Sequence, residues 1–335
     1  MFLNIGFSHD WWFQNYGYVF DEAFYLNARN KIQIMRAMDE IMQERFPYYT
    51  NPGGLKGSLI SNPTIAVEPF GHRFIPALFG CEINYSKDTT PWAGHVDLTD
   101  DEIMNMPFLT PDEFGRNDKA QTILRQAEEM RDLGHECSTQ QNTGSVINTA
   151  IYLRNNLFTD FYDKPDVIHR LFDLITNRME CSLEYFAEVD GRVCDIGVGN
   201  CCVCMLSPSV YETYNRPCDD HMMKMAKKLG VRFSIHQDSD VTPYIGSYKT
   251  FDYLYSFDVG QDTDLVLFRS AFPEVIMNIF VYSVWLLEND NIAIEKGIKD
   301  MISEAGPPEL TGISCYDIDA RTSDDKIEAL CSACS

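Results

Sequence analysis

The sequence lacks any long apolar run. No segment approaches the ~18 to 20 consecutive apolar residues that a membrane-spanning helix needs, and the first thirty residues have no basic start followed by an apolar block, as a secretory signal would. We therefore expect a soluble, cytoplasmic protein. In a reducing cytosol its eleven cysteines are expected to be free thiols or metal ligands rather than disulfides.

Basic residues are scarce. The 27 Lys and Arg stand against 50 Asp and Glu, which gives a net charge of −23. Such a charge repels phosphate backbones and anionic lipid surfaces, so we expect neither nucleic acid nor a membrane as a partner. The 335 residues can bury a sizeable core, and the absence of a Gly/Ser/Pro-rich linker indicates one structural domain.

Several catalytic and nucleotide-binding motifs are missing. There is no P-loop, no G-x-S-x-G and no H-E-x-x-H, which argues against the chemistries that depend on them. The nearest approach to a glycine-rich phosphate loop is GVGN at 197–200, and it lacks the G-x-G-x-x-G spacing. This absence disfavours an open doubly wound sheet.

What the chain does contain is an alternation of helical and strand-like patterns. Helices are predicted at 165–189, 207–230, 265–272 and 323–334, and strands at 192–199, 231–236, 253–258, 275–280 and 310–316. This alternation predicts a (β/α)8 TIM barrel over residues 61–335. Residues 1–60 are irregular and aromatic-rich, with one helical pattern at 27–46, and are predicted to form an arm that caps the barrel.

Polar side chains mark the ends of the predicted strands. In order along the chain they are Asp195, Asn200, His236, Asp238, Asp258, Cys315 and Asp317. Because the carboxyl ends of barrel strands meet around one mouth, we expect these side chains to share a site. Imidazole, carboxylate and thiolate suit Zn²⁺, and a catalytic zinc takes three protein ligands and keeps one open position. His236, Asp238 and Cys315 are the predicted ligands, with Asp195 as a further catalytic carboxylate.

A structural interpretation of the same residues stays open. A histidine at a strand end is often a hydrogen-bonded loop residue, and a free cysteine is often a small buried apolar side chain. The cluster NCCVC offers a competing source of thiols in Cys201, Cys202 and Cys204. The sequence leaves the role of these three cysteines open.

Three segments resemble the uroporphyrinogen decarboxylase superfamily. They are NTGSVINTAIYLRNNLFTDFYDKPDVIHRLFDLITNRM (142–179), LSPSVYETYNRPCDDHMMKMAKKLGVRFSIHQDSD (206–240) and LTGISCYDIDARTSDDKIEAL (310–330). The resemblance covers about residues 140–330 and implies a (β/α) barrel. One branch of the superfamily consists of metal-free decarboxylases, and the other of zinc-dependent methyltransferases that work with a corrinoid on a separate protein.

The resemblance favours the methyltransferase branch. Decarboxylases begin with an arginine-bearing motif that binds porphyrinogen carboxylates, whereas this chain has WWFQNYGY. Carried over residue by residue, His236 matches the zinc-ligand histidine, Asp238 stands where many members have cysteine, and Cys315 matches the ligand near the last strand. Zinc accepts carboxylate oxygen as well as thiolate, so the Asp238 difference is compatible with a metal.

The resulting functional hypothesis is methyl transfer from a small methylated substrate to a Co(I) corrinoid. The substrate is expected to be an aryl methyl ether, with Trp11, Trp12 and Tyr16 walling its pocket and Asn200 binding it. No D-x-H-x-x-G motif occurs, so the corrinoid (cobalamin) is expected on a partner protein. A thiol acceptor, a uroporphyrinogen decarboxylase-like decarboxylase, a non-catalytic barrel that binds a small ligand or a corrinoid protein, and a homodimer all stay open.

Overall fold

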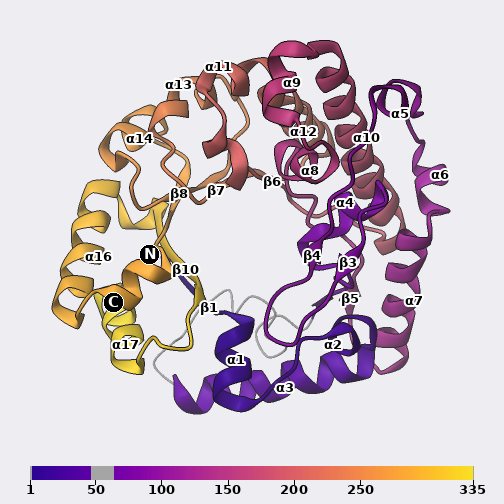
Figure 1. The fold of residues 1–335 in the computed structure, drawn as a ribbon. Helices are drawn as coiled ribbons and strands as arrows, with labels where there is room; N and C mark the ends of the chain where they lie inside the picture. Colours follow the sequence, from indigo (N-terminus) through magenta and orange to yellow (C-terminus); the bar gives the residue numbers. More distant parts are fainter. Residues whose placement is uncertain (1, 47–63, 335) are drawn as a thin grey trace.

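Eight parallel strands form the framework of the protein. The computed structural model describes residues 2–46 and 64–334. The parallel strands are β1 (Phe2–Phe7), β2 (Ile65–Ala66), β5 (Cys137–Ser138), β6 (Ile196–Gly199), β7 (Phe233–Gln237), β8 (Ser256–Gly260), β9 (Ile276–Phe280) and β10 (Thr311–Ile318). Six of them pair in the order β1-β10-β9-β8-β7-β6, and β2 pairs with β5. The elements follow one another around a ring (Figure 1), which confirms the predicted barrel class.

Helices cover the outside of this ring (Figure 1). They are α1 (His9–Tyr16), α2 (Glu22–Leu26), α3 (Ala28–Arg45), α4 (Phe74–Leu78), α5 (Asp100–Asn105), α6 (Pro111–Gly115), α7 (Asp118–Asp132), α8 (Val146–Leu153), α9 (Leu157–Asp163), α10 (Pro165–Asp190), α11 (Pro208–Val210), α12 (Arg216–Leu229), α13 (Ile245–Tyr248), α14 (Leu265–Ala271), α15 (Ser283–Glu288), α16 (Asn291–Ala305) and α17 (Asp324–Ala333). None of the described helices has both the length and the apolar content needed to cross a bilayer.

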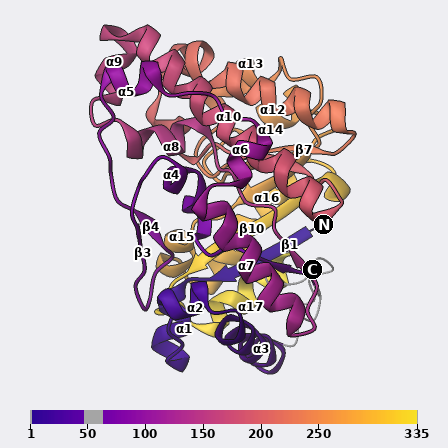
Figure 2. The ribbon, with the colours of Figure 1, turned by 90° about the vertical axis from the view of Figure 1, so that its right-hand side faces the viewer.

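Short elements complete the chain. The 3₁₀ turns are η1 (Gly71–Arg73), η2 (Cys201–Met205), η4 (Thr242–Tyr244) and η5 (Pro308–Leu310), and η3 (Tyr211–Asn215) is a π-helical segment between α11 and α12. A small antiparallel ladder joins β3 (Ile83–Asn84) to β4 (Trp92–Ala93). The two chain termini lie close together in both views (Figure 1, Figure 2).

The predicted long helices are confirmed, and their ends have local causes. Helix α3 begins after Asn27, whose side chain accepts a hydrogen bond from the Asn30 amide, as N-cap residues do. Helix α10 ends at Gly191, which adopts a left-handed conformation with φ 65° that costs glycine little. The predicted strand 192–199 is shorter than expected, because β6 begins only at Ile196.

The predicted division into an arm and a barrel is wrong at the start of the chain. Residues 2–7, which we assigned to the arm, form barrel strand β1 and pair with β10 through contacts such as Asn4 with Ser314. Helices α1, α2 and α3 then lie together on one side of the ring (Figure 1, Figure 2). The predicted boundary at residues 60 and 61 falls outside the described residues.

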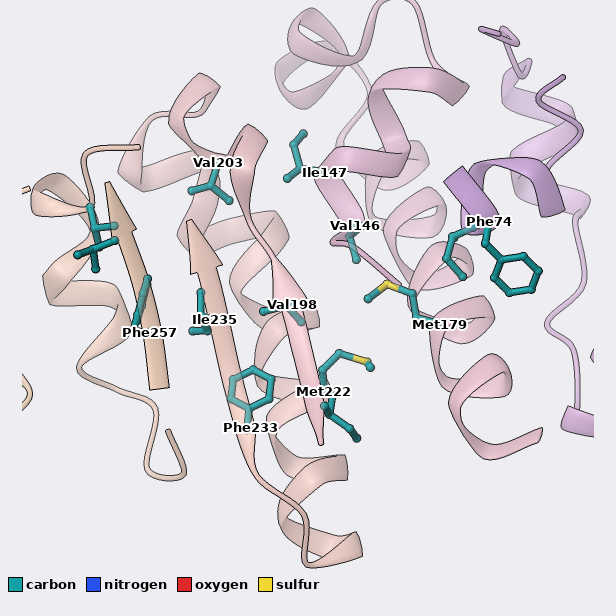
Figure 3. Close-up of a cluster of buried hydrophobic side chains, with 14 of the residues drawn as sticks. Phe74, Val146, Ile147, Met179, Val198, Val203, Met222, Phe233, Ile235 and Phe257 are labelled. Atoms are coloured by element: carbon teal, nitrogen blue, oxygen red, sulfur yellow. The ribbon is translucent and has the colours of Figure 1, made fainter. Parts of the chain in front are cut away.

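The two faces of the strands differ in character. Side chains on the outer face pack under the helices: Figure 3 shows Val198, Ile235 and Phe257 on three neighbouring strands, with Met222 of α12 near them. Burying each such side chain contributes about 1.5–3 kcal/mol. The inner face carries polar side chains, among them Ser234 and Ser256, which share a hydrogen bond of 2.7 Å. The helices therefore stabilise the barrel from outside, and its interior keeps polar groups available for a site.

Candidate metal centre

Three potential metal ligands converge at the carboxyl ends of β6 and β7. Cys201 opens η2, separated from the end of β6 by Asn200 alone, His236 belongs to β7, and Asp238 follows β7. One ligand atom from each, a thiol sulfur, an imidazole nitrogen and a carboxylate oxygen, all lie within 4.8 Å of one another. The His236 Nε2 and Asp238 Oδ2 atoms are 3.9 Å apart. These are the donor types that zinc accepts.

The backbone brings these residues together. Gly199 lies opposite His236 in the parallel register, and the Asn200 amide donates to the His236 carbonyl at 2.6 Å. On the other side of β6, the Gly199 amide donates to the Gly144 carbonyl at 3.1 Å. The first residue after β6 is thereby held beside the end of β7, and this places Cys201 next to His236.

A carboxylate behind His236 fixes the orientation of the imidazole. Its Nδ1 lies 2.8 Å from the Asp258 Oδ2 atom on the neighbouring strand. Asn278 Nδ2 donates to Asp258 Oδ1 at 3.1 Å and to Ser314 Oγ at 2.6 Å. Metal-binding histidines commonly donate their second nitrogen to a carboxylate in this way, which leaves Nε2 for the metal. The hydrogen bonds that link His236, Asp258, Asn278 and Ser314 therefore leave the Nε2 atom of His236 facing Cys201 and Asp238.

The electrostatics of the cluster favour a positive charge at its centre. Burial alone would lower the pKa of His236, but hydrogen bonds with Asp258 and Cys201 outweigh it and raise that pKa to about 10. Burial also raises the pKa of the adjacent Cys202 thiol to about 11. A thiol and two carboxylates around one imidazole thus stabilise a cation, either a proton on the ring or a metal ion.

The predicted ligand Cys315 does not join this cluster. Strand side chains alternate between faces, and Ser314 occupies the inner face with Asn278. Cys315 therefore lies on the outer face, 0% exposed, where burial raises its pKa to about 12 and Cys331 of α17 is a neighbour. Among the described residues, Cys201 supplies the thiol in its place. The sequence offered Cys201 only as one of three competing thiols in NCCVC.

Two further predictions of site residues are corrected. Asp195 precedes β6 and pairs with Arg232, which precedes β7, so both lie at the amino ends of the strands, away from the mouth. Asn200 is fully buried, and its side chain donates to Asp219 and to the Tyr248 hydroxyl. It is a structural residue rather than a substrate contact.

A cavity of about 310 Å³ lies at the carboxyl ends of β1, β2 and β10. Its described lining is largely apolar and aromatic, with a few charged groups: Ile5, Gly6, Phe7, His9, Trp12, Phe20, Phe24, Tyr25, Lys31, Met35, Met38, Asp39, Met42, Ala66, Glu68, Gly71, His72, Thr90, Tyr316 and Asp317. Ligand sites typically have this mixture. Gly6 is required here, since a Cβ on it would lie 2.6 Å from the Tyr316 ring.

Only one of the three predicted aromatic wall residues lines this cavity. Trp12 does so, whereas Trp11 is 0% exposed and packs under the Arg45 guanidinium. Tyr16 accepts a hydrogen bond from Arg45 instead.

Two aromatic rings connect the cavity with the cluster of Cys201, His236 and Asp238. The ring of Tyr316 lies 5.7 Å from that of Phe280, which lies 5.6 Å from the His236 imidazole. The cavity and the cluster therefore belong to one mouth of the barrel.

Burial lowers the pKa of two basic side chains that line the cavity. Lys31 is 6% exposed and donates to the Ala66 carbonyl at 3.1 Å; burial lowers its pKa and nearby Glu68 partly opposes that shift. Burial and the neighbouring His72 lower the pKa of His9 to about 4, so this ring is neutral. Asp317 has a left-handed backbone with φ 56°, which is uncommon outside glycine and is often found at functional sites.

Comparison with known proteins agrees with this architecture. Among solved structures, a methyltransferase from Methanosarcina mazei superposes with a TM-score of 0.65 at 15% sequence identity, over 98% of this chain and 90% of the other. At that identity the likeness shows the fold alone. A search among curated proteins finds no relative with significant sequence similarity. The family model described as uroporphyrinogen decarboxylase (URO-D) matches residues 63–334, and the chain belongs to that family.

Proposed function

We propose that the protein is a zinc-dependent methyltransferase. Zn²⁺ would be held by Cys201, His236 and Asp238, and the methyl donor would be a small methylated compound, an aryl methyl ether, bound in the adjacent cavity. The acceptor in this proposal is a Co(I) corrinoid carried by a partner protein. The observation that carries the proposal is the convergence of the three donor atoms within 4.8 Å at the carboxyl mouth of a URO-D family barrel.

The donor set fits the metal. One thiolate, one imidazole and one carboxylate are three protein ligands, which leaves the fourth position that a catalytic zinc uses for its substrate. When bound, zinc would supply Lewis acidity to the heteroatom that loses the methyl group. Asp258 supports this role, because its hydrogen bond at 2.8 Å to Nδ1 keeps the His236 lone pair on Nε2.

The cavity residues would position the donor and exclude water. Trp12, Phe20 and Phe24 provide flat apolar walls for an aromatic body. Lys31 is the described lining residue best suited to donate a proton to the departing oxygen, since it is an ammonium whose pKa burial lowers. The bond between methyl carbon and oxygen breaks with both electrons staying on oxygen, and this proton neutralises the product.

The decarboxylase alternative is less well supported. Its substrate would carry several carboxylates, whereas the described cavity lining contains Asp39, Glu68 and Asp317 against the single lysine Lys31. A metal-free decarboxylase would also have no use for the thiol, imidazole and carboxylate grouped at the end of β7.

Metal analysis and a cobalt assay test the proposal. The protein should contain one zinc per chain, which C201S and H236A lose and C315S retains. C315S is the matched control, because it removes a thiol of the same barrel outside the cluster. With a reduced corrinoid protein and a panel of methoxylated aromatics, the cobalt spectrum should show methyl-cobalt formation. A protein that binds no metal, or no spectral change with any donor, would contradict the proposal.

A further inference from the structure

The residues next to the three candidate ligands point to the opposite side of the sheet. Asn200 precedes Cys201, and Gln237 stands between His236 and Asp238. Both side chains are 0% exposed. His236 and Gln237 are neighbours within β7, so their side chains face opposite ways, and Asn200 is the residue between the end of β6 and Cys201. Contacts that hold Asn200 and Gln237 behind the sheet therefore fix the backbone from which the adjacent ligands project.

A hydrogen-bonded chain behind the sheet joins these two residues. The Asn200 Nδ2 atom donates to Asp219 Oδ2 at 2.8 Å and lies 3.2 Å from the Tyr248 hydroxyl. That hydroxyl in turn donates to Gln237 Oε1 at 2.7 Å. The strand end that carries Cys201 and the strand end that carries His236 and Asp238 are thereby connected through buried side chains of α12 and α13.

Asp219 is the point at which this network converges. It is 1% exposed, and its Oδ2 atom accepts hydrogen bonds from Asn200, from the Tyr211 hydroxyl at 3.0 Å and from Asn215 Nδ2 at 3.1 Å. Tyr211 and Asn215 lie at the two ends of the π-helical segment η3. Such segments are rare and often occur at functional sites.

The position occupied by Oδ2 requires a hydrogen-bond acceptor, because all three of its partners donate to it. Hydrogen bonds to an ionised carboxylate are stronger than those to a neutral amide oxygen. An asparagine would remove the charge and so weaken all three bonds. An aspartate with no contact to the cluster is therefore built into the layer directly behind it.

We propose that Asp219 is a positioning residue, which holds Cys201 beside His236 and Asp238 through Asn200 and through Tyr248 with Gln237. The inference rests on the proposed metal site. Partners behind the metal ligands typically change metal affinity by about 10- to 100-fold when they are removed. Asp219 touches none of the ligands, so its effect would pass entirely through their neighbours.

The test compares D219N with D220N. Both substitutions remove one carboxylate from adjacent positions of α12, but Asp220 pairs with Lys224 on the accessible side. Cobalt(II) titration of the metal-free proteins, followed by thiolate-to-cobalt absorption, should give about 10- to 100-fold weaker binding for D219N and unchanged binding for D220N. Y248F removes the hydroxyl that contacts Gln237 and Asn200 but leaves the hydrogen bond between Asn200 and Asp219, so it should give a smaller loss in the same direction.

Thermal unfolding of the same metal-free samples separates positioning from a merely structural role. A lower melting temperature of D219N with wild-type cobalt affinity would overturn the inference. If D219N does not fold, Y248F decides: weaker cobalt binding supports the inference, and wild-type binding overturns it.

A metal-independent measurement distinguishes this inference from the proposed function. Failure of the wild-type protein to bind metal would refute the zinc site. The alkylation rate of Cys201, followed by peptide mass spectrometry, would then test positioning alone. His236 beside the thiol promotes its reaction, so D219N should react about tenfold more slowly than wild type and D220N at the wild-type rate. Equal rates for D219N and wild type would overturn the positioning role.

Discussion

The mouth of the barrel has two unlike halves. At the ends of β6 and β7, the inner side chains are metal-ligand types supported by polar partners from β8, β9 and β10. At the ends of β1, β2 and β10, an apolar cavity is walled by α1, α2 and α3. Under the proposed function, the first half of the mouth would activate a bond and the second would hold the molecule that contains it.

The largest expected effect comes from removing a ligand in the first half. H236A or C201S should lower the proposed methyl-transfer activity by at least about 10³-fold, because each would leave the proposed zinc with two protein ligands. Zinc content measured by atomic absorption should fall in parallel. C315S should keep both. Equal zinc loss in C201S and C315S would show that the thiol has been assigned to the wrong strand.

A smaller effect is expected from the carboxylate behind the imidazole. D258N removes the charged acceptor of His236 Nδ1 and should weaken metal binding by about 10- to 100-fold while the fold persists. A competitive chelator titration measures the affinity, and D252N, on an exposed acid paired with Lys227, serves as the control. Equal metal affinities of D258N and D252N would show that Asp258 does not support the proposed metal site.

A substitution in the cavity should weaken substrate binding without changing the zinc content. M38W places a larger side chain in the cavity and should raise KM about tenfold or more at constant zinc content, as expected when a substrate pocket is filled. Steady-state kinetics with zinc analysis on the same samples check this. Loss of zinc in M38W would mean that the two halves are not separable.

The smallest effect concerns pH. Burial raises the pKa of Asp219 from 3.8 to about 7, although hydrogen bonds from Asn200, Tyr211 and Asn215 oppose the shift. The folded protein then holds this proton more tightly than the unfolded chain, so this group's contribution to stability falls as pH rises from about 4 to about 7.

Urea unfolding at several pH values measures this slope, which should amount to a few kcal/mol at most. In D219N the slope should be smaller. An unchanged slope would mean that Asp219 is already ionised at low pH in the folded protein.

The sequence predicted the second half of the chain better than the first for a physical reason. Helix α10 and strands β7 to β10 have long or regular apolar periods, so local patterns suffice to find them. Strands β2 and β5 have two residues each and form by pairing with each other, so they could not be predicted from a local sequence pattern. Strand β1 was not predicted, because its partner β10 lies at the other end of the chain.

Only part of the candidate cluster could be predicted from the sequence, for a similar reason. His236 and Asp238, which do lie together, were chosen because polar residues stand at the end of an apolar strand pattern. Cys315 was chosen without following the alternation of side chains along β10, and Asp195 was misplaced because the start of β6 was set too early. Cys201 could be preferred over Cys315 only once the register of Gly199 opposite His236 was known.

X-ray absorption at the zinc edge would identify the ligands of the proposed zinc. We expect one sulfur ligand at about 2.3 Å, with the remaining donors nitrogen or oxygen at about 2.0–2.2 Å, and loss of that sulfur in C201S. A shell with two or more protein sulfurs, or a sulfur that persists in C201S and disappears in C315S, would contradict this expectation.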